Sequence, residues 1–266
     1  MNEVISVYGV AAGYVMLIIP LVIFLWYHTG LVKPTLVGIL RMTVQLLFVG
    51  LYLKVVFDQN NPFLTLLWLL IMIAVADGSI LSRCELRFSA VGFEVYIALL
   101  LGTLIPLGCF VGIILMKPNL LEAQYAIPVG GMILGNCLRS NIVGIRAFYH
   151  SIRQQEKWYH YQLALGATRA EALRPFLVEA MNQAYSPTLA MLATVGLVSL
   201  PGMMTGVILA GRNPLDAILY QISIMIAIFT GTAITVLLGI LLTTRKAFNE
   251  FGLLEEKIFK RKAGGQ

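Results

Sequence analysis

The sequence predicts an all-α integral membrane protein. Of its 266 residues, 59% are hydrophobic and only 12% are charged, and the mean hydropathy is +0.84. A soluble domain is closer to half apolar and one quarter charged. Several apolar stretches are long enough to cross a bilayer as helices, which takes about 20 residues, and none shows the alternation of a barrel strand. The composition excludes a soluble globular enzyme and also a disordered or fibrous chain.

Seven stretches are predicted to span the membrane. They are residues 5–27, 35–57, 63–81, 88–116, 127–148, 185–209 and 217–242. We expect the first to be a retained helix and not a signal peptide, because no basic residue precedes it and its first charge is Glu3. The fourth is too long for an upright span, so we expect it to tilt or to bend at Pro106. The fifth is interrupted by the polar residues Asn136, Arg139, Ser140 and Asn141.

Lys and Arg are distributed unevenly between the two sides of the predicted bundle. With residues at the ends of spans counted with the adjoining loops, one set of loops and tails carries 14 of the 19, the opposite set carries 3, and Arg41 and Arg139 lie within spans. Because positively charged loops stay in the cytoplasm, the N-terminus is predicted to lie outside and the C-terminus in the cytoplasm. Residues 1–266 are then one transmembrane domain with a cytoplasmic loop at about 149–184. A charged cytoplasmic tail at about 245–266 is predicted to form a surface helix.

The cytoplasmic loop contains the pattern of two helices joined by a turn. Residues 156–165 are predicted to form a helix that ends at Gly166, because glycine favours the left-handed conformation of a C′ residue. Thr168 and Glu171 have the spacing of a capping box, so a second helix is predicted to begin there. Pro175 is predicted to interrupt this second helix early and leave it short, on the membrane surface. The pattern indicates either a docking element for a cytoplasmic partner or an ordered connector between two spans.

Motifs of enzymatic chemistry are absent from the sequence. It contains no HExxH, no GxSxG and no GxxxxGK[ST] loop that would hold a nucleotide phosphate. Any ATP hydrolysis that drives this chain would therefore take place on another subunit. Cys84, Cys109 and Cys137 are scattered, which argues against a disulfide framework or a zinc site.

Some charged residues fall within predicted spans, where charge is costly and usually faces a cavity or a partner. Asp77 lies near the cytoplasmic end of the third span, where it either reaches interfacial water or faces a polar pathway. Glu94 in the fourth span and Arg139 in the fifth form either a structural ion pair or part of such a pathway. Carboxylates are natural ligands for hard metal cations, which makes Glu94 a candidate metal contact.

The sixth predicted span is interrupted at Pro201 and Gly202. Proline removes one hydrogen bond of the helix and glycine loosens the backbone, so a hinge or gate is predicted there. Met203 and Met204 follow directly, and two adjacent thioethers suit transient contact with a soft metal ion. Methionine more often packs in a core than it binds a metal, so packing is the alternative for both residues.

The turn in the cytoplasmic loop resembles a known coupling element. Ala164-Leu165-Gly166-Ala167-Thr168, followed by Glu171 and Ala172, looks like the coupling loop of ABC transporter permeases. That loop inserts into a groove on the ATPase subunit. The Glu-Ala-Ala of the importer consensus is replaced here by His160-Tyr161-Gln162, so the resemblance implies coupling but not a standard importer.

A longer stretch is similar to one family of such permeases. It reads Thr194-Val-Gly-Leu-Val-Ser-Leu-Pro-Gly-Met-Met-Thr-Gly-Val-Ile-Leu-Ala-Gly211, followed by Asn213-Pro214 and Tyr220-Gln221-Ile222. This stretch closely resembles the signature of FetB-type permeases, and Arg41-Met-Thr-Val-Gln45-Leu46 resembles the second span of the same family. These proteins are the membrane subunits of a small ABC family linked to iron export in bacteria, with plant relatives linked to aluminium tolerance.

The resemblance implies an exporter that works as a homodimer with two copies of a separate ATPase, which bind ATP and Mg. It implies no cofactor and no catalytic residue in this chain, no nucleic-acid partner, and a location in the lipid bilayer of the bacterial inner membrane. Iron or another metal ion is the expected cargo, and a metal complex or a sugar nucleotide is the alternative within this class. A gradient-driven secondary transporter or channel is the alternative from a different class.

Overall fold

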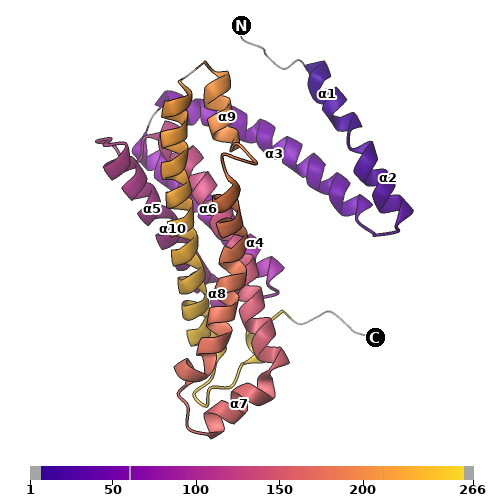
Figure 1. The fold of residues 1–266 in the computed structure, drawn as a ribbon, viewed down its shortest axis with the longest axis vertical. Helices are drawn as coiled ribbons and strands as arrows, with labels where there is room; N and C mark the ends of the chain where they lie inside the picture. The colour runs from indigo at the N-terminus through magenta and orange to yellow at the C-terminus, as the bar shows by residue number, and fades with distance from the viewer. Residues whose placement is uncertain (1–6, 60, 212, 261–266) are drawn as a thin grey trace. The chain divides into compact units, whose positions relative to one another are not determined.

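The computed structural model describes residues 7–59, 61–211 and 213–260. Within these residues the chain is helical apart from turns and isolated bridges (Figure 1). It divides into two units, Met1–Gln59 and Asn60–Gln266. Residues 5 and 6 of the first predicted span and residues 261–266 of the predicted tail lie outside the described residues.

The first unit contains α1 (Val7–Val15), α2 (Ile18–Trp26) and α3 (Val32–Gln59). Only a turn at Met16 and Leu17 separates α1 from α2, so Gly9–Trp26 is one apolar stretch of 18 residues. Positive φ angles at His28 and Gly30 help to reverse the chain between α2 and α3. Most large apolar side chains of α2 and α3 are exposed in this chain, as expected of helices that face lipid or a neighbouring subunit.

The second unit is a helical bundle. Its helices are α4 (Pro62–Arg83), α5 (Phe88–Cys109), α6 (Ala123–Gln154), α7 (Glu156–Ala164), α8 (Arg169–Thr194), α9 (Gly202–Leu209) and α10 (Pro214–Ala247). α10 contacts α5, α6, α8 and α9, and α6 contacts α4, α5 and α8. Their buried side chains form one core that reaches α7, and its largest members include Phe110, Phe148, Tyr159 and Phe176.

Two glycines bring the backbones of α5 and α10 together. A Cβ atom added to Gly231 would lie 2.5 Å from the Gly102 carbonyl oxygen, and a Cβ atom added to Gly102 would collide with the Thr235 side chain. Small residues allow membrane helices to approach this closely. The contact between α5 and α10 therefore requires glycine on both helices.

Five helical stretches among the described residues are long and apolar enough to cross a membrane. They are Gly9–Trp26, Val32–Gln59, Pro62–Arg83, Phe88–Ile114 and Pro214–Ala247. They confirm an all-α membrane protein and correspond to the first four predicted spans and the last. The helix of the fourth span continues past Pro106 and then changes pitch in a π-helical turn, η1 (Phe110–Ile114).

The two remaining predicted spans, 127–148 and 185–209, are not among these five stretches. Residues 127–148 lie in the continuous helix α6, where polar residues such as Ser140 and Asn141 are buried inside the bundle and lower the hydropathy. The prediction of one span over 185–209 is wrong, because α8 ends at Thr194 and α9 begins only at Gly202. The sequence predicted this break at Pro201 and Gly202, but in the structure it begins at residue 195.

The predicted cytoplasmic loop at 149–184 is largely helical. α6 extends to Gln154, and α8 runs through Pro175 without a break. The prediction that Pro175 leaves the second helix short is therefore wrong. Leu173 and Phe176 are buried on either side of it, and their packing offsets the single hydrogen bond that proline removes.

The described part of the tail is not the predicted surface helix. Residues 248–260, which we call the C-terminal strap, fold back across the end of the bundle and include one 3₁₀ turn, η2 (Glu256–Ile258). Phe248, Ile258 and Phe259 are buried. A helix on the membrane surface would leave the strap's apolar side chains only half covered, whereas the folded strap buries three of them in the core.

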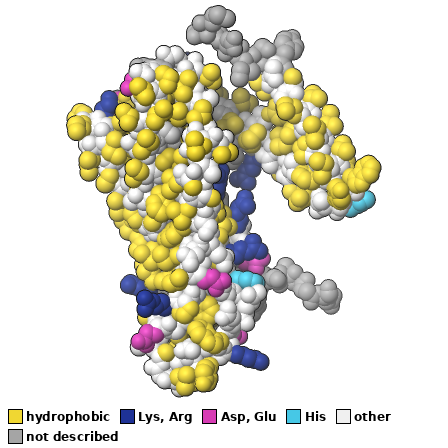
Figure 2. All heavy atoms as spheres, viewed as in Figure 1, with side chains coloured by type: hydrophobic (Ala, Val, Ile, Leu, Met, Phe, Trp, Pro, Cys, Tyr) yellow, Lys and Arg dark blue, Asp and Glu magenta, His cyan; other side chains and the backbone are white. Residues whose placement is uncertain are grey.

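Polar and apolar surfaces are segregated along the second unit. Apolar side chains cover most of its visible face, and charged side chains gather mainly toward the α7 end (Figure 2). This distribution is typical of a membrane bundle with one polar end outside the bilayer.

Candidate functional site

α7 and α8 form a hairpin at the polar end of the second unit (Figure 1). The Ala167 N–H donates to the Gln162 carbonyl at 3.1 Å and the Gly166 N–H donates to the Leu163 carbonyl at 3.0 Å, which is a Schellman motif. Gly166 has φ +92°, a left-handed conformation that costs a residue with a side chain roughly 1–2 kcal/mol. The predicted C′ role of Gly166 is confirmed.

The predicted capping box at the start of α8 is also confirmed. Thr168 Oγ1 accepts a hydrogen bond from the Glu171 N–H at 3.3 Å, and the Thr168 N–H donates to Glu171 Oε2 at 2.8 Å. Hydrogen bonds from the Thr168 hydroxyl and backbone lower the pKa of Glu171. A carboxylate whose pKa is lowered on folding stabilises the fold above its ordinary pKa and loses that contribution as the pH falls through the lowered value. The capping box therefore weakens only in acid.

The turn between the two helices is exposed. Leu165 is 66% exposed at its tip. The other predicted coupling residues with exposed side chains or backbone are Ala164, Gly166, Thr168 and Glu171, and Ala167 is half-buried. Ala172 is only 2% exposed, so it packs toward the core and does not lie on this surface.

The C-terminal strap holds α7 against the bundle. The hydroxyl of the buried Tyr159 donates to the Gly252 carbonyl at 2.7 Å. Its ring packs against Phe176 of α8 and Phe248 of the strap, with centroids 6.3 and 5.8 Å away. Burial raises the pKa of Tyr159, so the hydroxyl keeps its proton and remains a donor.

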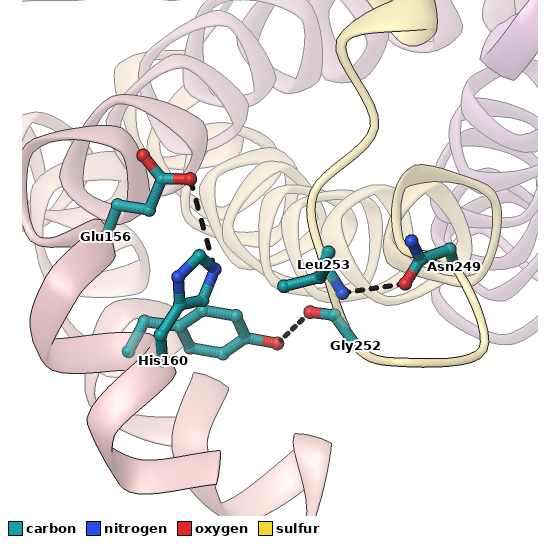
Figure 3. Close-up of polar contacts among 6 residues, drawn as sticks. Glu156, His160, Asn249, Gly252 and Leu253 are labelled. Carbon is teal, nitrogen blue, oxygen red and sulfur yellow. Dashed lines mark hydrogen bonds and ion pairs between the residues drawn. The ribbon is translucent and has the colours of Figure 1, made fainter. Parts of the chain in front are cut away.

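The strap turn that presents this carbonyl is itself ordered by Asn249. Asn249 Oδ1 accepts a hydrogen bond from the Leu253 N–H at 2.9 Å (Figure 3). Gly252 has φ +76°, and a Cβ atom there would lie 3.2 Å from Leu163 of α7. The strap and α7 are therefore matched in shape as well as in hydrogen bonding.

We expect Tyr159→Phe to loosen the strap from α7 without unfolding the bundle. The variant keeps the ring but leaves the Gly252 carbonyl without its partner, which costs about 1–3 kcal/mol for a buried group. Tryptic cleavage after Lys257 in detergent should become several-fold faster while the helical circular dichroism stays unchanged. Tyr161→Phe, at an exposed position of the same helix, is the control. Cleavage of Tyr159→Phe at the wild-type rate would contradict this role.

Residues 195–201 interrupt the helical path between α8 and α9. Gly196 has φ +89°, and its N–H donates to the Ser199 carbonyl at 2.9 Å, which closes a tight turn. Leu197 is 90% exposed at the tip of this turn. Pro201 is the N-cap residue of α9, and Gly202 is its first residue. Irregular backbone inside a membrane is tolerated only where protein covers it or where it lines a water-filled cavity.

A cavity of about 580 Å³ lies between α6, α9 and α10. Met203 and Met204 of α9 line it together with Asp216 and Gln221 of α10 and Gln124 of α6. Gln221 is buried, and its Oε1 has no hydrogen-bond partner among the described residues. The lining thus combines thioether, carboxylate and amide groups, all of which can contact cations.

The other predicted pathway residues lie away from this cavity. Asp77 on α4 is 1% exposed, so it is shielded from water, and its Oδ1 has no partner in the described part of the chain. Glu94 is half-buried on α5, Arg139 is exposed on α6, and no ion pair joins these two described residues. Arg139 borders a separate hollow of about 150 Å³. Asp77, Glu94 and Arg139 do not form one site with the two methionines.

Comparison with known proteins identifies the family. Residues 7–248 match a family model described as "Uncharacterised protein family (UPF0014)". The chain belongs to the UPF0014 family. A UPF0014 membrane protein of Synechocystis is 35% identical over 210 residues, which cover 79% of this chain and 81% of the relative. No solved structure matches the chain.

Two further relatives of this UPF0014 chain carry functional names. "Probable iron export permease protein FetB" of Escherichia coli is 30% identical over 247 residues, 91% of this chain and 92% of the relative. "Protein ALUMINUM SENSITIVE 3" of Arabidopsis thaliana is 30% identical over 215 residues, 81% of this chain and 77% of the relative. The resemblance to FetB-type permeases is therefore confirmed, and the chain is a multi-pass membrane protein of that family.

Gln124, Asp216 and Gln221 are candidate pathway residues of this UPF0014 chain that the sequence did not single out. Gln221 lies within the stretch that resembles FetB-type permeases, but its polarity is hidden in an apolar window of α10. Ala217, Tyr220 and Gln221 recur at helical spacing and all line the cavity. A search for polar residues on one face of the last predicted span would have found Tyr220 and Gln221, but not Gln124 or Asp216, which lie outside that span.

Proposed function

We propose that this UPF0014 chain is the membrane-spanning subunit of an ATP-driven exporter of iron or another metal ion. The observation that carries the proposal is the similarity, over 91% of the chain, to a relative named as a probable iron export permease. The ATPase is a separate subunit that binds ATP and Mg, because this sequence has no phosphate-binding loop. Two copies of each subunit work together in the bacterial inner membrane, with the C-terminus in the cytoplasm, where the 14 Lys and Arg accumulate.

The α7–α8 hairpin is the proposed docking element for the ATPase. Its exposed tip at Leu165 is held on one side by the Schellman motif and on the other by the capping box. α8 then runs for 26 residues from this tip to the break at 195–201, which leads into α9 and the cavity. Movement of the hairpin on ATP binding would be transmitted along one helix to the segment that lines the cargo path.

The cavity between α6, α9 and α10 is the proposed cargo path. Among the residues that the structure describes, no three His, Cys, Asp or Glu side chains lie close enough to hold a metal ion. Weak, mixed contacts from Met203, Met204, Asp216 and Gln221 suit an ion that enters and leaves again, because a transported ion needs sites that release it.

We expect the double variant Met203→Leu/Met204→Leu to reduce metal-dependent stimulation of the partner ATPase. Leucine conserves volume, so packing should change little, while both thioether ligands are lost. The metal concentration for half-maximal stimulation should rise by roughly tenfold, which corresponds to about 1.4 kcal/mol of binding free energy. Met225→Leu on α10 is the matched control, because Met225 is buried outside the lining of this cavity. Equal metal-dependent stimulation of the ATPase by the double variant and the control would mean that both methionines only pack and do not contact the metal.

Cellular iron content tests the proposed function. Cells that express the chain together with its ATPase should retain less iron after an iron load than cells that lack either protein. Parallel measurements of manganese, zinc and aluminium identify the preferred ion. Unchanged content of every metal, with the protein present in the membrane, would contradict metal export.

A further inference from the structure

A cleft of about 450 Å³, separate from the cavity between α6, α9 and α10, lies at the polar end of the second unit. The turn between α4 and α5, the end of α6 and the C-terminal strap form its walls. Its charged lining consists of Glu85, Arg87, Arg153, Glu256, Lys257 and Lys260. Four of these six side chains are cationic, so the cleft is suited to an anion.

The cleft lies at the membrane surface. Only residues 84–87 connect α4 to α5, and both helices are long and apolar enough to span the bilayer. So short a connection between two spans has to lie at the boundary between hydrocarbon and headgroups. Glu85 and Arg87 are therefore at headgroup depth, and Phe88, which begins α5, is 66% exposed beside them.

The acidic groups leave part of the positive charge uncompensated. Arg153 pairs with Glu256 at 2.7 Å, and Lys257 pairs with the neighbouring Glu255. The lining cations that form no ion pair with a described residue are Arg87 and Lys260, and Glu85 is the lining carboxylate that forms none, so one positive charge remains uncompensated.

Backbone hydrogen bonds hold these two residues next to each other. The Arg87 N–H donates to the Ile258 carbonyl at 2.8 Å, and the Lys260 N–H donates to the Glu85 carbonyl at 2.7 Å. Glu85 has φ +57°, which is uncommon for a residue with a side chain, and these contacts hold it in place. The cleft is thus formed before any ligand arrives, which lowers the entropic cost of binding.

We propose that this cleft binds the phosphate headgroup of an anionic phospholipid. Arg and Lys side chains form charge-assisted hydrogen bonds with phosphate oxygens, and basic pockets at the cytoplasmic ends of membrane helices recognise lipid headgroups. The exposed Phe88 side chain offers an apolar surface for the acyl chains directly below the headgroup. The same strap that closes the cleft also bonds to Tyr159 of α7, so a bound lipid would stabilise the support of the hairpin.

Thermal stability of the purified full-length chain in detergent tests the proposal. Phosphatidylglycerol should raise the melting temperature, whereas phosphatidylcholine and inorganic phosphate at equal concentration should not. In Arg87→Gln/Lys260→Gln the half-maximal phosphatidylglycerol concentration should rise roughly 25-fold, since each basic group near an anionic lipid contributes about fivefold. Lys246→Gln, which removes an exposed charge from the last turn of α10 outside the cleft, is the matched control and should respond like wild type.

Three outcomes would overturn the assignment. An equal response to phosphatidylcholine would mean that lipid binds without regard to charge, and a full response to inorganic phosphate would make the ligand a free anion. An unchanged response of the double variant would locate lipid binding elsewhere. If the double variant fails to fold, the single variant Lys260→Gln and the comparison of lipids on the wild-type chain decide whether the cleft binds the lipid. Lys260→Gln should fold, because residue 260 donates its backbone N–H to the Glu85 carbonyl whichever side chain it carries.

Discussion

Gly231→Val should prevent accumulation of the folded chain in the membrane, and Gly231→Ala should lower its melting temperature markedly. A single Cβ atom at this position would lie 2.5 Å from the Gly102 carbonyl oxygen and 2.8 Å from the Ile133 side chain. Because one of these neighbours is backbone, α5 and α10 would have to separate. Overpacking of this kind costs about 1–3 kcal/mol or more. Fluorescence-detected gel filtration after heating measures the effect for both variants.

Gly108→Ala provides the matched control for this prediction. Gly108 lies in the same helix as Gly102, but a Cβ atom there would meet nothing within 4 Å. Alanine has a higher helix propensity than glycine, so this variant should be neutral or slightly more stable. Equal losses of stability for Gly108→Ala and Gly231→Ala would mean that glycine acts through backbone flexibility and not through the close contact of α5 with α10.

The double variant Gly166→Val/Thr168→Ala should insert normally and lose productive contact with the ATPase. Valine at φ +92° costs roughly 1–2 kcal/mol, and loss of the Thr168 cap costs about 1 kcal/mol. Neither cost unfolds a bundle whose core lies elsewhere, but both act on the hairpin that would fit a groove of the partner. The ATPase should no longer co-purify with the chain. ATP hydrolysis in nanodiscs should fall to the rate of the ATPase alone.

A conservative pair separates hairpin geometry from side-chain identity. Asparagine tolerates the left-handed conformation and serine caps helices well, so Gly166→Asn/Thr168→Ser should retain most of the coupling. Wild-type association and turnover of the Gly166→Val/Thr168→Ala protein would make the hairpin a mere connector between α7 and α8.

Local signals in the sequence predicted local structure well. Gly166 and the Thr168–Glu171 pair define helix ends through contacts within a few residues, and the structure has both caps as predicted. Five of the seven predicted spans likewise correspond to helices able to span a membrane, because the length and hydropathy of a span are properties of its own residues.

The features that were missed depend on tertiary packing. Pro175 was expected to end a helix, but the burial of Phe176 beside it keeps α8 continuous. The strap was expected to be a surface helix, but burial of Phe259 and the bond from Tyr159 to Gly252 draw it onto the bundle. The whole cavity could not be assembled from the sequence, because the α6 residues of its lining, such as Gln124, are far in the chain from those of α9 and α10.

In the proposed function, this chain moves a metal ion with energy supplied by a separate ATPase. The most direct test is iron flux in proteoliposomes that contain the chain, with or without its ATPase, and with or without Mg-ATP. We expect iron movement only when both proteins and hydrolysable ATP are present, and loss of that movement in Gly166→Val/Thr168→Ala. Iron flux that follows a proton or sodium gradient in liposomes containing this chain alone would contradict it.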